Sequence, residues 1–190
     1  MEVFNLKNKI EEKIFRGVVS MFIKKGLQAT TQEVAKEADV AEVTLYRRYS
    51  TKENLFTTVI QDILERKFHS QVLKLAEEED TEMFLTKIIK NRLELLSINS
   101  DLIKMLLSEC LRGNLKIDLP DMIFTTLKKG LDHHFQLKNQ TVDIDFCARQ
   151  LGGVFLSYVM LPNEQPIHQL SEKEKENIAR RHALSVMSVL

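Results

Sequence analysis

Apolar side chains recur at helical spacing along almost the whole chain, and this pattern constrains the fold more than any other feature. Near the start, Ile10, Ile14, Val18 and Phe22 follow one another at intervals of four residues, which places them on one face of a helix. Clean alternation of apolar and polar residues, typical of half-buried strands, is absent. Three prolines and six glycines among 190 residues leave few helix breakers. The sequence therefore predicts an all-α fold.

Several short patterns predict where helices begin and end. The segment KKG at 24–26 suits a helix end, because lysines favour its negative end and glycine adopts the left-handed conformation beyond it. Thr30 with Glu33 fits a capping box, and Ser50 with Glu53 is a second possible box. Ser100, Thr141 or Asp143, and Ser171 (in a third box with Glu174) are plausible caps for later helices. These helices are expected near residues 81–97, 101–112, 120–137, 143–161 and 172–190.

Charge and composition exclude several classes of protein. The chain has 27 basic and 27 acidic residues, so nucleic acid could bind only at a local basic patch. Cys110 and Cys147 are too few for a disulfide framework or a zinc site. The longest apolar run, at 152–161, is about half a membrane span, and residues 1–13 lack the apolar core of a signal peptide. We expect a cytoplasmic protein without a membrane span, metal or cofactor.

Catalytic signatures are also missing. The five histidines show no metal-ligand spacing, and the sequence has no GxSxG, GxGxxG or GxxxxGK motif. We therefore do not expect an enzyme, although a helical enzyme without a familiar motif is a third, weaker possibility.

The segment TLYRRYSTKENLF, at 44–56, concentrates cationic, hydroxyl and aromatic side chains between apolar anchors. It follows a helix, a short helix and the tight turn ADVA, which is the order of a helix-turn-helix motif. The second short helix of this motif enters the DNA major groove. Arginine can pair with guanine or phosphate, while tyrosine, threonine and lysine reach phosphates or thymine methyls. The segment therefore predicts a DNA-recognition helix.

Residues 10–56 resemble the DNA-binding domain of the TetR (tetracycline repressor) family of transcriptional regulators. The matching elements occur in order: an amphipathic helix ending in KKG, then ATTQEVAKEADV, TLYRRY and STKENLF. The rest of the chain resembles the family in helical character, length and two long final helices. The resemblance implies a helix-turn-helix domain at 1–56, linked through a helix from about 51 to 78 to a helical ligand-binding and dimerisation domain at 57–190.

The resemblance also implies which residues meet DNA. Phosphate contacts fall at Thr31, Tyr46 and Lys52, whereas Leu45 and Tyr49 are packing positions. Base-reading or groove-facing positions fall at Glu42, Val43, Thr44, Arg47 and Arg48.

The sequence departs from the family pattern at the turn and at the start of the recognition helix. Asp39 replaces the turn glycine, Ala41 replaces a serine cap, and Glu42–Val43 replaces a lysine–glycine pair. Glu42 repels phosphate but can accept a hydrogen bond from cytosine. These departures affect the expected affinity and operator sequence more than the expected fold.

The C-terminal part is rich in methionine and phenylalanine at helical spacing. By default such residues form a core, but the resemblance implies an inducer pocket between the helices, suited to a small, mostly apolar effector. Arg92, Glu109 and His134 are possible polar anchors. The candidate pocket residues are Met83, Phe84, Met105, Phe124, Leu127, Phe155 and Tyr158.

Small residues in the penultimate helix allow a close helix contact. Ala148 and Gly152 lie four residues apart, which fits either a tight crossing within one chain or the family's dimer seam. The candidate seam residues are Ala148, Gly152, Phe155, Leu156, Val159, Leu184 and Met187, with Val189 beyond them.

These features predict a homodimeric, ligand-responsive transcriptional regulator, with a repressor favoured over an activator, that binds a pseudo-palindromic operator in double-stranded DNA. The alternative is a dimeric helical ligand-binding or adaptor protein of the same fold with little DNA affinity, and Glu42 is the feature that favours it.

Overall fold

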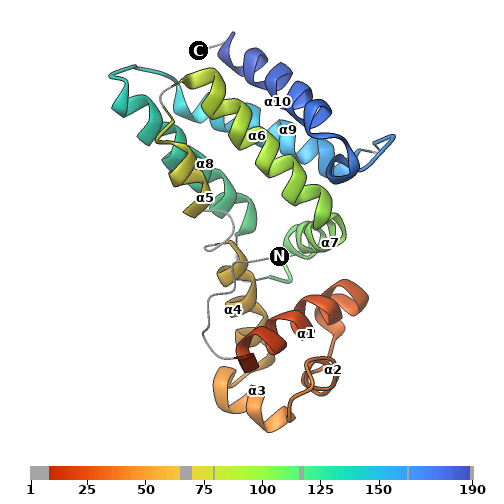
Figure 1. The fold of residues 1–190 in the computed structure, drawn as a ribbon. Helices are drawn as coiled ribbons and strands as arrows, with labels where there is room; N and C mark the ends of the chain where they lie inside the picture. Colours follow the sequence, from red (N-terminus) through yellow and green to blue (C-terminus); the bar gives the residue numbers. More distant parts are fainter. Residues whose placement is uncertain (1–8, 65–69, 79, 116–117, 162, 189–190) are drawn as a thin grey trace. The chain divides into compact units, whose positions relative to one another are not determined.

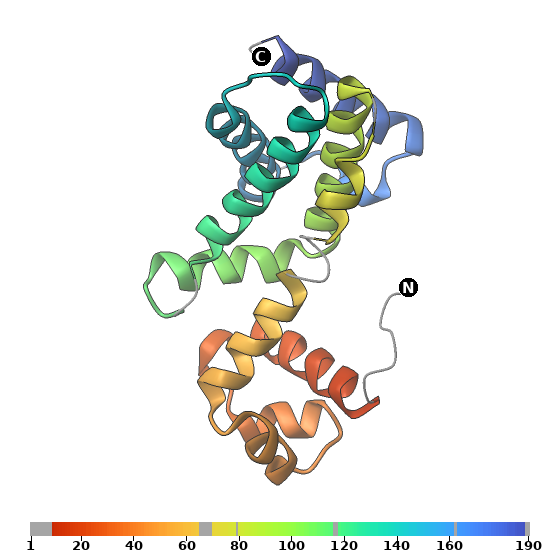
Figure 2. The same ribbon diagram turned by 90° about the vertical axis from the view of Figure 1, so that its left-hand side faces the viewer.

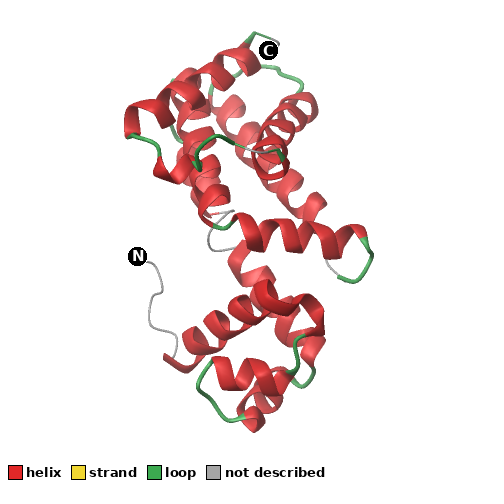
Figure 3. Cartoon of the chain, turned by 90° about the vertical axis from the view of Figure 1, so that its right-hand side faces the viewer, coloured by secondary structure: helices red, strands yellow, loops and turns green. Residues whose placement is uncertain are grey.

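The computed structural model describes residues 9–64, 70–78, 80–115, 118–161 and 163–188. All regular structure in these ranges is helical (Figure 3), which confirms the predicted all-α class. The chain forms two compact units. The first comprises Met1–Ile63 and Met105–Asp118, and the second comprises Leu64–Lys104 and Leu119–Leu190.

The first unit is built on an N-terminal group of helices, shown in red to amber in Figure 1. Their apolar faces meet in a small core, where the Phe22 and Phe56 ring centroids lie 5.1 Å apart. Ile14, Val18 and Leu45 are also buried there, as the spacing in the sequence predicts, whereas Ile10 at the start of α1 is 41% exposed. The elements are α1 (Lys9–Lys25), the 3-10 helix η1 (Gly26–Gln28), α2 (Thr31–Glu37), α3 (Glu42–Tyr49) and α4 (Lys52–Leu64).

Residues 105–118 join this first unit although they are far away in sequence. They include most of α7 (Ser100–Leu111), which begins in the second unit. A Cβ placed on Gly26 would lie 3.6 Å from Glu109 Oε1, which shows how closely α7 approaches η1.

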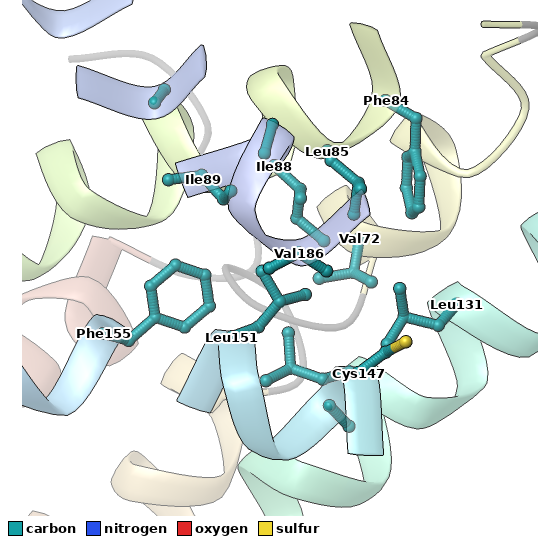
Figure 4. Packing of buried hydrophobic residues seen from close by; sticks show 14 of the residues in the cluster. Val72, Phe84, Leu85, Ile88, Ile89, Leu131, Cys147, Leu151, Phe155 and Val186 are labelled. Atoms are coloured by element: carbon teal, nitrogen blue, oxygen red, sulfur yellow. The ribbon is translucent and has the colours of Figure 1, made fainter. Parts of the chain in front are cut away.

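The second unit is a helical bundle around a continuous apolar core. Helix α6 packs against both α9 and α10, and α8 packs against α9 and α5 (Figures 1 and 2). Side chains from these helices point toward one another in the core (Figure 4). The elements are α5 (Ser70–Leu75), α6 (Thr81–Ile98), α8 (Leu119–Leu137), α9 (Ile144–Met160), the 3-10 helix η3 (Ile167–Gln169) and α10 (Glu172–Met187).

An ion cluster fixes α10 on α6. The ammonium of Lys175 is nearly buried and donates to Glu94 at 2.7 Å and to Glu172 at 2.9 Å. Both hydrogen bonds raise the pKa of Lys175, with the bond to Glu94 contributing most. The pairing compensates the charge of a lysine that would otherwise be costly to bury.

Most predicted helix ends are confirmed. Capping boxes form at Thr30 and at Ser171, and Asp143, rather than Thr141, caps α9. Gly26 has the expected left-handed conformation, with φ of 59°. Ser100 is the first residue of α7 rather than the residue before it.

The predicted capping box at Ser50 is wrong. The Ser50 N–H donates to the Tyr46 carbonyl at 2.9 Å, so Ser50 ends α3, with φ of 63°. Thr51 takes the capping role instead, because its hydroxyl accepts from the Asn54 N–H at 3.1 Å. The range 51–78, predicted as one linking helix, contains α4 and α5. Residues 65–69, between these two helices, lie outside the described residues.

Candidate nucleic-acid interface

The turn between α2 and α3 is closed by the backbone and by one ion pair. The Val40 N–H donates to the Ala35 carbonyl at 3.0 Å, and Asp39 adopts a left-handed conformation with φ of 53°. The Lys13 ammonium donates to the Asp39 carboxylate at 2.7 Å, which lowers the pKa of Asp39. Aspartate tolerates this conformation better than most residues, so the helix-turn-helix geometry is kept without a turn glycine.

Helix α1 holds the same turn from the other side. A Cβ on Gly17 would lie 2.7 Å from the Ala38 Cβ, so the two backbones approach more closely than alanine at 17 would allow. Glu37 accepts from Lys24 at 2.8 Å and from Ser20 at 2.6 Å. These contacts lock α2 against α1 and thereby set the position from which α3 starts.

Helix α3 has one inward anchor and a largely exposed opposite side. Leu45 is 1% exposed and packs into the core, whereas Val43 is 71% exposed and Tyr46 is 50% exposed. Arg47 is exposed and Thr44 is half-buried. Val43, Tyr46 and Arg47 are therefore available to a groove, as the sequence pattern predicts.

Arg48 differs from its neighbour Arg47. Its guanidinium lies 3.9 Å from the Glu11 carboxylate of α1, and its Nε is buried without a hydrogen-bond partner among the described residues. The adjacent Tyr49 hydroxyl has a raised pKa, chiefly because of burial and then because of the negative charge of Glu11. Arg48 and Tyr49 thus both face α1, and Glu11 is a neighbour that the sequence pattern does not reveal.

Three of the predicted DNA-binding residues contact one another. The Thr31 hydroxyl, at the start of α2, donates to Glu42 Oε1 at 2.6 Å and lies 3.1 Å from the Tyr46 hydroxyl. Thr31 is only 9% exposed. The structure therefore brings together two predicted phosphate contacts and the acidic residue that heads the recognition helix.

Lys52, the third predicted phosphate contact, stands at the first position of α4. Its ammonium donates to the Leu27 carbonyl at 2.8 Å. That bond uses one of its three N–H donors, so the cation is held in place while the other donors can serve an anion.

The seven residues expected to line an effector pocket do not gather in one cluster. Phe84, Leu127 and Phe155 are buried in the packed core of the second unit (Figure 4 shows two of them). Met83, in contrast, is 48% exposed on α6. Met105 belongs to the first unit.

The remaining two pocket candidates are partly buried and lie beside polar groups. The Arg149 guanidinium stands 5.1 Å from the centre of the Phe124 ring. The Tyr158 hydroxyl lies 3.1 Å from His182 Nε2. Both aromatic side chains pack against the core from its margin.

The three possible polar anchors are likewise not brought together by either unit. Glu109 lies in the first unit and accepts from the Asn114 amide at 2.8 Å. Arg92 is 1% exposed in the second unit, and burial lowers its pKa to about 10. A guanidinium with this pKa is still charged at neutral pH.

His134 is fully buried and satisfied at both ring nitrogens. Nδ1 lies 3.2 Å from the Ala76 carbonyl, so it carries the proton, and Nε2 lies 3.1 Å from the Thr81 hydroxyl, from which it accepts. Burial lowers its pKa. These bonds explain His134 as a structural residue that links α8 to the segment before α6.

The candidate seam residues divide into buried and exposed sets. Ala148, Phe155 and Val159 are at most 5% exposed and belong to the interior of their own chain. Burial in the chain's own core leaves them little surface to offer a partner. Met187 is partly buried against the same core, and Val189 lies outside the described residues.

The other seam residues face outward. A Cβ on Gly152 would meet no atom of the described residues within 4 Å, so no close helix crossing among them requires this glycine. Leu156 is 50% exposed and Leu184 is 46% exposed. Met160, four residues beyond Leu156 on the same helix, is 57% exposed. Leu156, Met160 and Leu184 are thus exposed apolar residues of α9 and α10, and with the half-buried Gly152 they are hereafter called the α9–α10 patch.

Comparison with known proteins agrees with this geometry. Residues 14–59 match the family model described as bacterial regulatory proteins, tetR family. The match covers the whole helix-turn-helix region, from within α1 to within α4. The chain carries a TetR-family DNA-binding domain. No curated protein sequence matches the chain significantly.

Solved structures of several bacterial regulators share the fold over almost the whole chain. A Clostridium perfringens protein whose proposed role is regulation of fatty acid metabolism has a TM-score of 0.70 and 24% identity, covering 92% of this chain and 97% of its own. Bacillus subtilis FadR in complex with stearoyl-CoA has a TM-score of 0.67 and 16% identity, covering 95% and 99%. The TetR-family regulator PfmR from Thermus thermophilus has a TM-score of 0.67 and 17% identity, covering 97% and 98%.

The departures from the TetR pattern have visible structural consequences. Ala41 precedes α3 without any side-chain capping bond. Glu42 then occupies the first helical position, where a negative charge is favoured by the helix dipole, and it takes the Thr31 hydroxyl as its partner.

Among the described residues no helix could cross a membrane, and no group of His, Cys, Asp or Glu side chains could hold a metal ion.

Proposed function

We propose that this chain is a ligand-responsive transcriptional regulator, acting as a homodimeric repressor on a pseudo-palindromic operator. The observation that carries the DNA-binding part is the arrangement of α3. Buried Leu45 fixes the helix, while Val43, Tyr46 and Arg47 stand on its exposed side. The proposed DNA-binding domain is residues 1–56, with Thr44, Arg48 and Lys52 completing the contact set.

The proposed dimer uses the α9–α10 patch. Single exposed apolar residues are ordinary, but several of them on two helices that pack together suit a protein interface. Two copies related by two-fold symmetry would present two recognition helices to two half-sites. The proposed second domain, residues 57–190, would therefore combine dimerisation with effector binding.

The proposed effector is a long-chain fatty acyl compound. Bacillus subtilis FadR, which has the same fold, is described in complex with stearoyl-CoA. In this chain, partly buried Phe124 and Tyr158 and buried Phe84, Leu127 and Phe155 supply apolar surface from several helices of the second unit. The buried cation of Arg92 would suit an acidic head group.

Two binding measurements test these proposals. Arg47→Ala should weaken operator binding and alter base preference. Lys173→Ala, which removes an exposed cation on α10, should do neither.

Stearoyl-CoA should bind to the chain and lower its affinity for DNA. Linkage requires operator DNA to weaken acyl binding by the same factor, typically about 5–150-fold. Calorimetry with and without operator measures this coupling. Absence of acyl binding would remove the fatty acyl proposal but leave DNA binding intact.

The alternative is an adaptor of the same fold with little DNA affinity. The hydrogen bond between Thr31 and Glu42 favours it, since a carboxylate lies beside the proposed phosphate contacts. An absence of duplex binding at low salt by the intact chain would support the adaptor.

A further inference from the structure

The contact of Thr31, Glu42 and Tyr46 has a defined direction. The Thr31 hydroxyl has one proton, and it points to Glu42 Oε1 over 2.6 Å. The Tyr46 hydroxyl, 3.1 Å away, must then donate to the Thr31 oxygen. The result is a chain of hydrogen bonds from Tyr46 through Thr31 to the Glu42 carboxylate, in which each bond polarises the next.

We propose that Glu42 is an internal competitor of the DNA phosphate. Its carboxylate accepts the Thr31 hydroxyl proton, and the Thr31 oxygen in turn accepts the Tyr46 hydroxyl proton. Both protons would otherwise be available to the DNA backbone. The inference rests on the proposed DNA-binding function and assigns Glu42 a specific part in it. Glu42 lowers affinity for every duplex alike, rather than selecting one base.

The competition follows from donor count and burial. A hydroxyl donates one hydrogen bond at a time, so Thr31 serves either Glu42 or a phosphate. Thr31 is only 9% exposed, so water competes little for its hydroxyl. A carboxylate and a phosphate both present anionic oxygens to the same donor, and the bonds of both are charge-assisted. DNA binding at this point therefore requires Glu42 to move aside.

Two other roles for Glu42 predict different behaviour. If Glu42 accepted a hydrogen bond from cytosine, its removal would weaken binding to cytosine-containing sites. If it acted only by charge repulsion, its removal would strengthen binding whether or not Thr31 had a hydroxyl. Internal competition alone makes the gain depend on the Thr31 hydroxyl.

A mutant cycle separates these roles. Binding to a labelled random-sequence duplex is measured by fluorescence anisotropy across a salt series for the full chain, Glu42→Gln, Thr31→Val and the double variant. Glu53→Gln is the charge-matched control, because Glu53 is exposed in the first turn of α4. Glu42→Gln should bind roughly tenfold more tightly than the parent, and clearly more tightly than Glu53→Gln does.

When residue 31 is valine, Glu42→Gln should raise duplex affinity no more than the control Glu53→Gln does. When residue 31 is serine, the full gain in affinity from Glu42→Gln should return. Tyr46→Phe provides a second background if Thr31→Val is poorly folded, and it should reduce the gain in part. A full gain without the Thr31 hydroxyl would overturn the inference in favour of charge repulsion, and a loss of affinity in Glu42→Gln would overturn it in favour of base reading.

The proposed function can fail separately. If the parent binds duplex and Glu42→Gln does not change affinity, the internal competitor is wrong and DNA binding stands. If neither chain binds duplex at low salt, both proposals are wrong.

Discussion

Phe84 stacks on the imidazole of His134, with ring centroids 4.1 Å apart, inside the core of the second unit. The neutral form of His134 donates to the Ala76 carbonyl and accepts from the Thr81 hydroxyl. A charged ring would lose the bond from Thr81 and leave a cation buried among apolar groups. The fold is therefore linked to the protonation state of this side chain.

The free energy of unfolding should decrease as pH falls below about 6.5, where unfolded histidine takes up a proton. Burial lowers the pKa of His134 in the fold, so the unfolded chain binds protons first and acid favours it. The pKa of His182 is lowered by burial too, and it acts in the same direction. Urea unfolding from pH 5 to 8 measures the effect.

The His134→Gln variant should have a lower free energy of unfolding than the parent at pH 7.5, and this free energy should vary less with pH. His133→Gln, an exposed change at the adjacent position, serves as the control. A parent chain whose unfolding free energy rises on acidification through this range would contradict the assignment of a neutral, buried His134.

Gly17→Ala should destabilise the first unit by about 1–3 kcal/mol, the usual cost of overpacking. The added Cβ would lie 2.7 Å from the Ala38 Cβ and 2.9 Å from the Ala38 backbone nitrogen. Backbone atoms cannot rotate away as a side-chain tip can. Thermal denaturation measures the change, and Arg16→Ala on the exposed side of α1 should remain within about 0.5 kcal/mol. If Arg16→Ala and Gly17→Ala lowered stability equally, the contact between Gly17 and Ala38 would not be as tight as described.

Lys52→Ala should weaken binding to all duplexes about equally and reduce the slope of log affinity against log salt by about one. The reason is that its ammonium is positioned by the Leu27 carbonyl at the start of α4. Lys173→Ala on α10 is the control for loss of one positive charge. An unchanged salt slope in Lys52→Ala would show that this lysine does not meet phosphate.

Gly152→Leu should lower dimerisation and DNA binding together while the chain stays folded. A Cβ at this position would meet no atom of the described residues within 4 Å, so the substitution should act mainly on a partner. Sedimentation velocity at micromolar concentration reports the oligomeric state, with Lys173→Leu as an exposed control. A parent chain that sediments as a stable monomer would refute the proposed seam.

Much of the architecture could be predicted because helix periodicity and capping are local. The range 81–97 became α6 at Thr81–Ile98, and Ser171 formed its expected box. Where two local solutions compete, the sequence alone cannot choose. Ser50 and Thr51 both carry hydroxyls at capping spacing, but the Tyr46 carbonyl captures the Ser50 N–H and thereby moves the cap to Thr51.

Contacts between distant segments were harder to predict. Thr31 and Glu42 are 11 residues apart and meet because the turn at Asp39 folds α3 back on α2. The orientation of Arg48 toward Glu11 depends on how α1 crosses α3. In the second unit, residue type identified apolar positions correctly but could not separate buried Phe155 from exposed Leu156, which follow each other on α9.

The measurement that tests the central claim most directly is selection of bound sequences from a random DNA library by the intact chain. A two-fold regulator with the exposed α3 face described above should enrich an inverted repeat, with half-site centres about 34–36 Å apart or at a multiple of that distance. The enriched repeat should bind the Arg47→Ala variant more weakly than the parent. Two results would contradict the account. One is that no sequence is enriched. The other is enrichment of a single, unrepeated motif that the Arg47→Ala variant binds as well as the parent does.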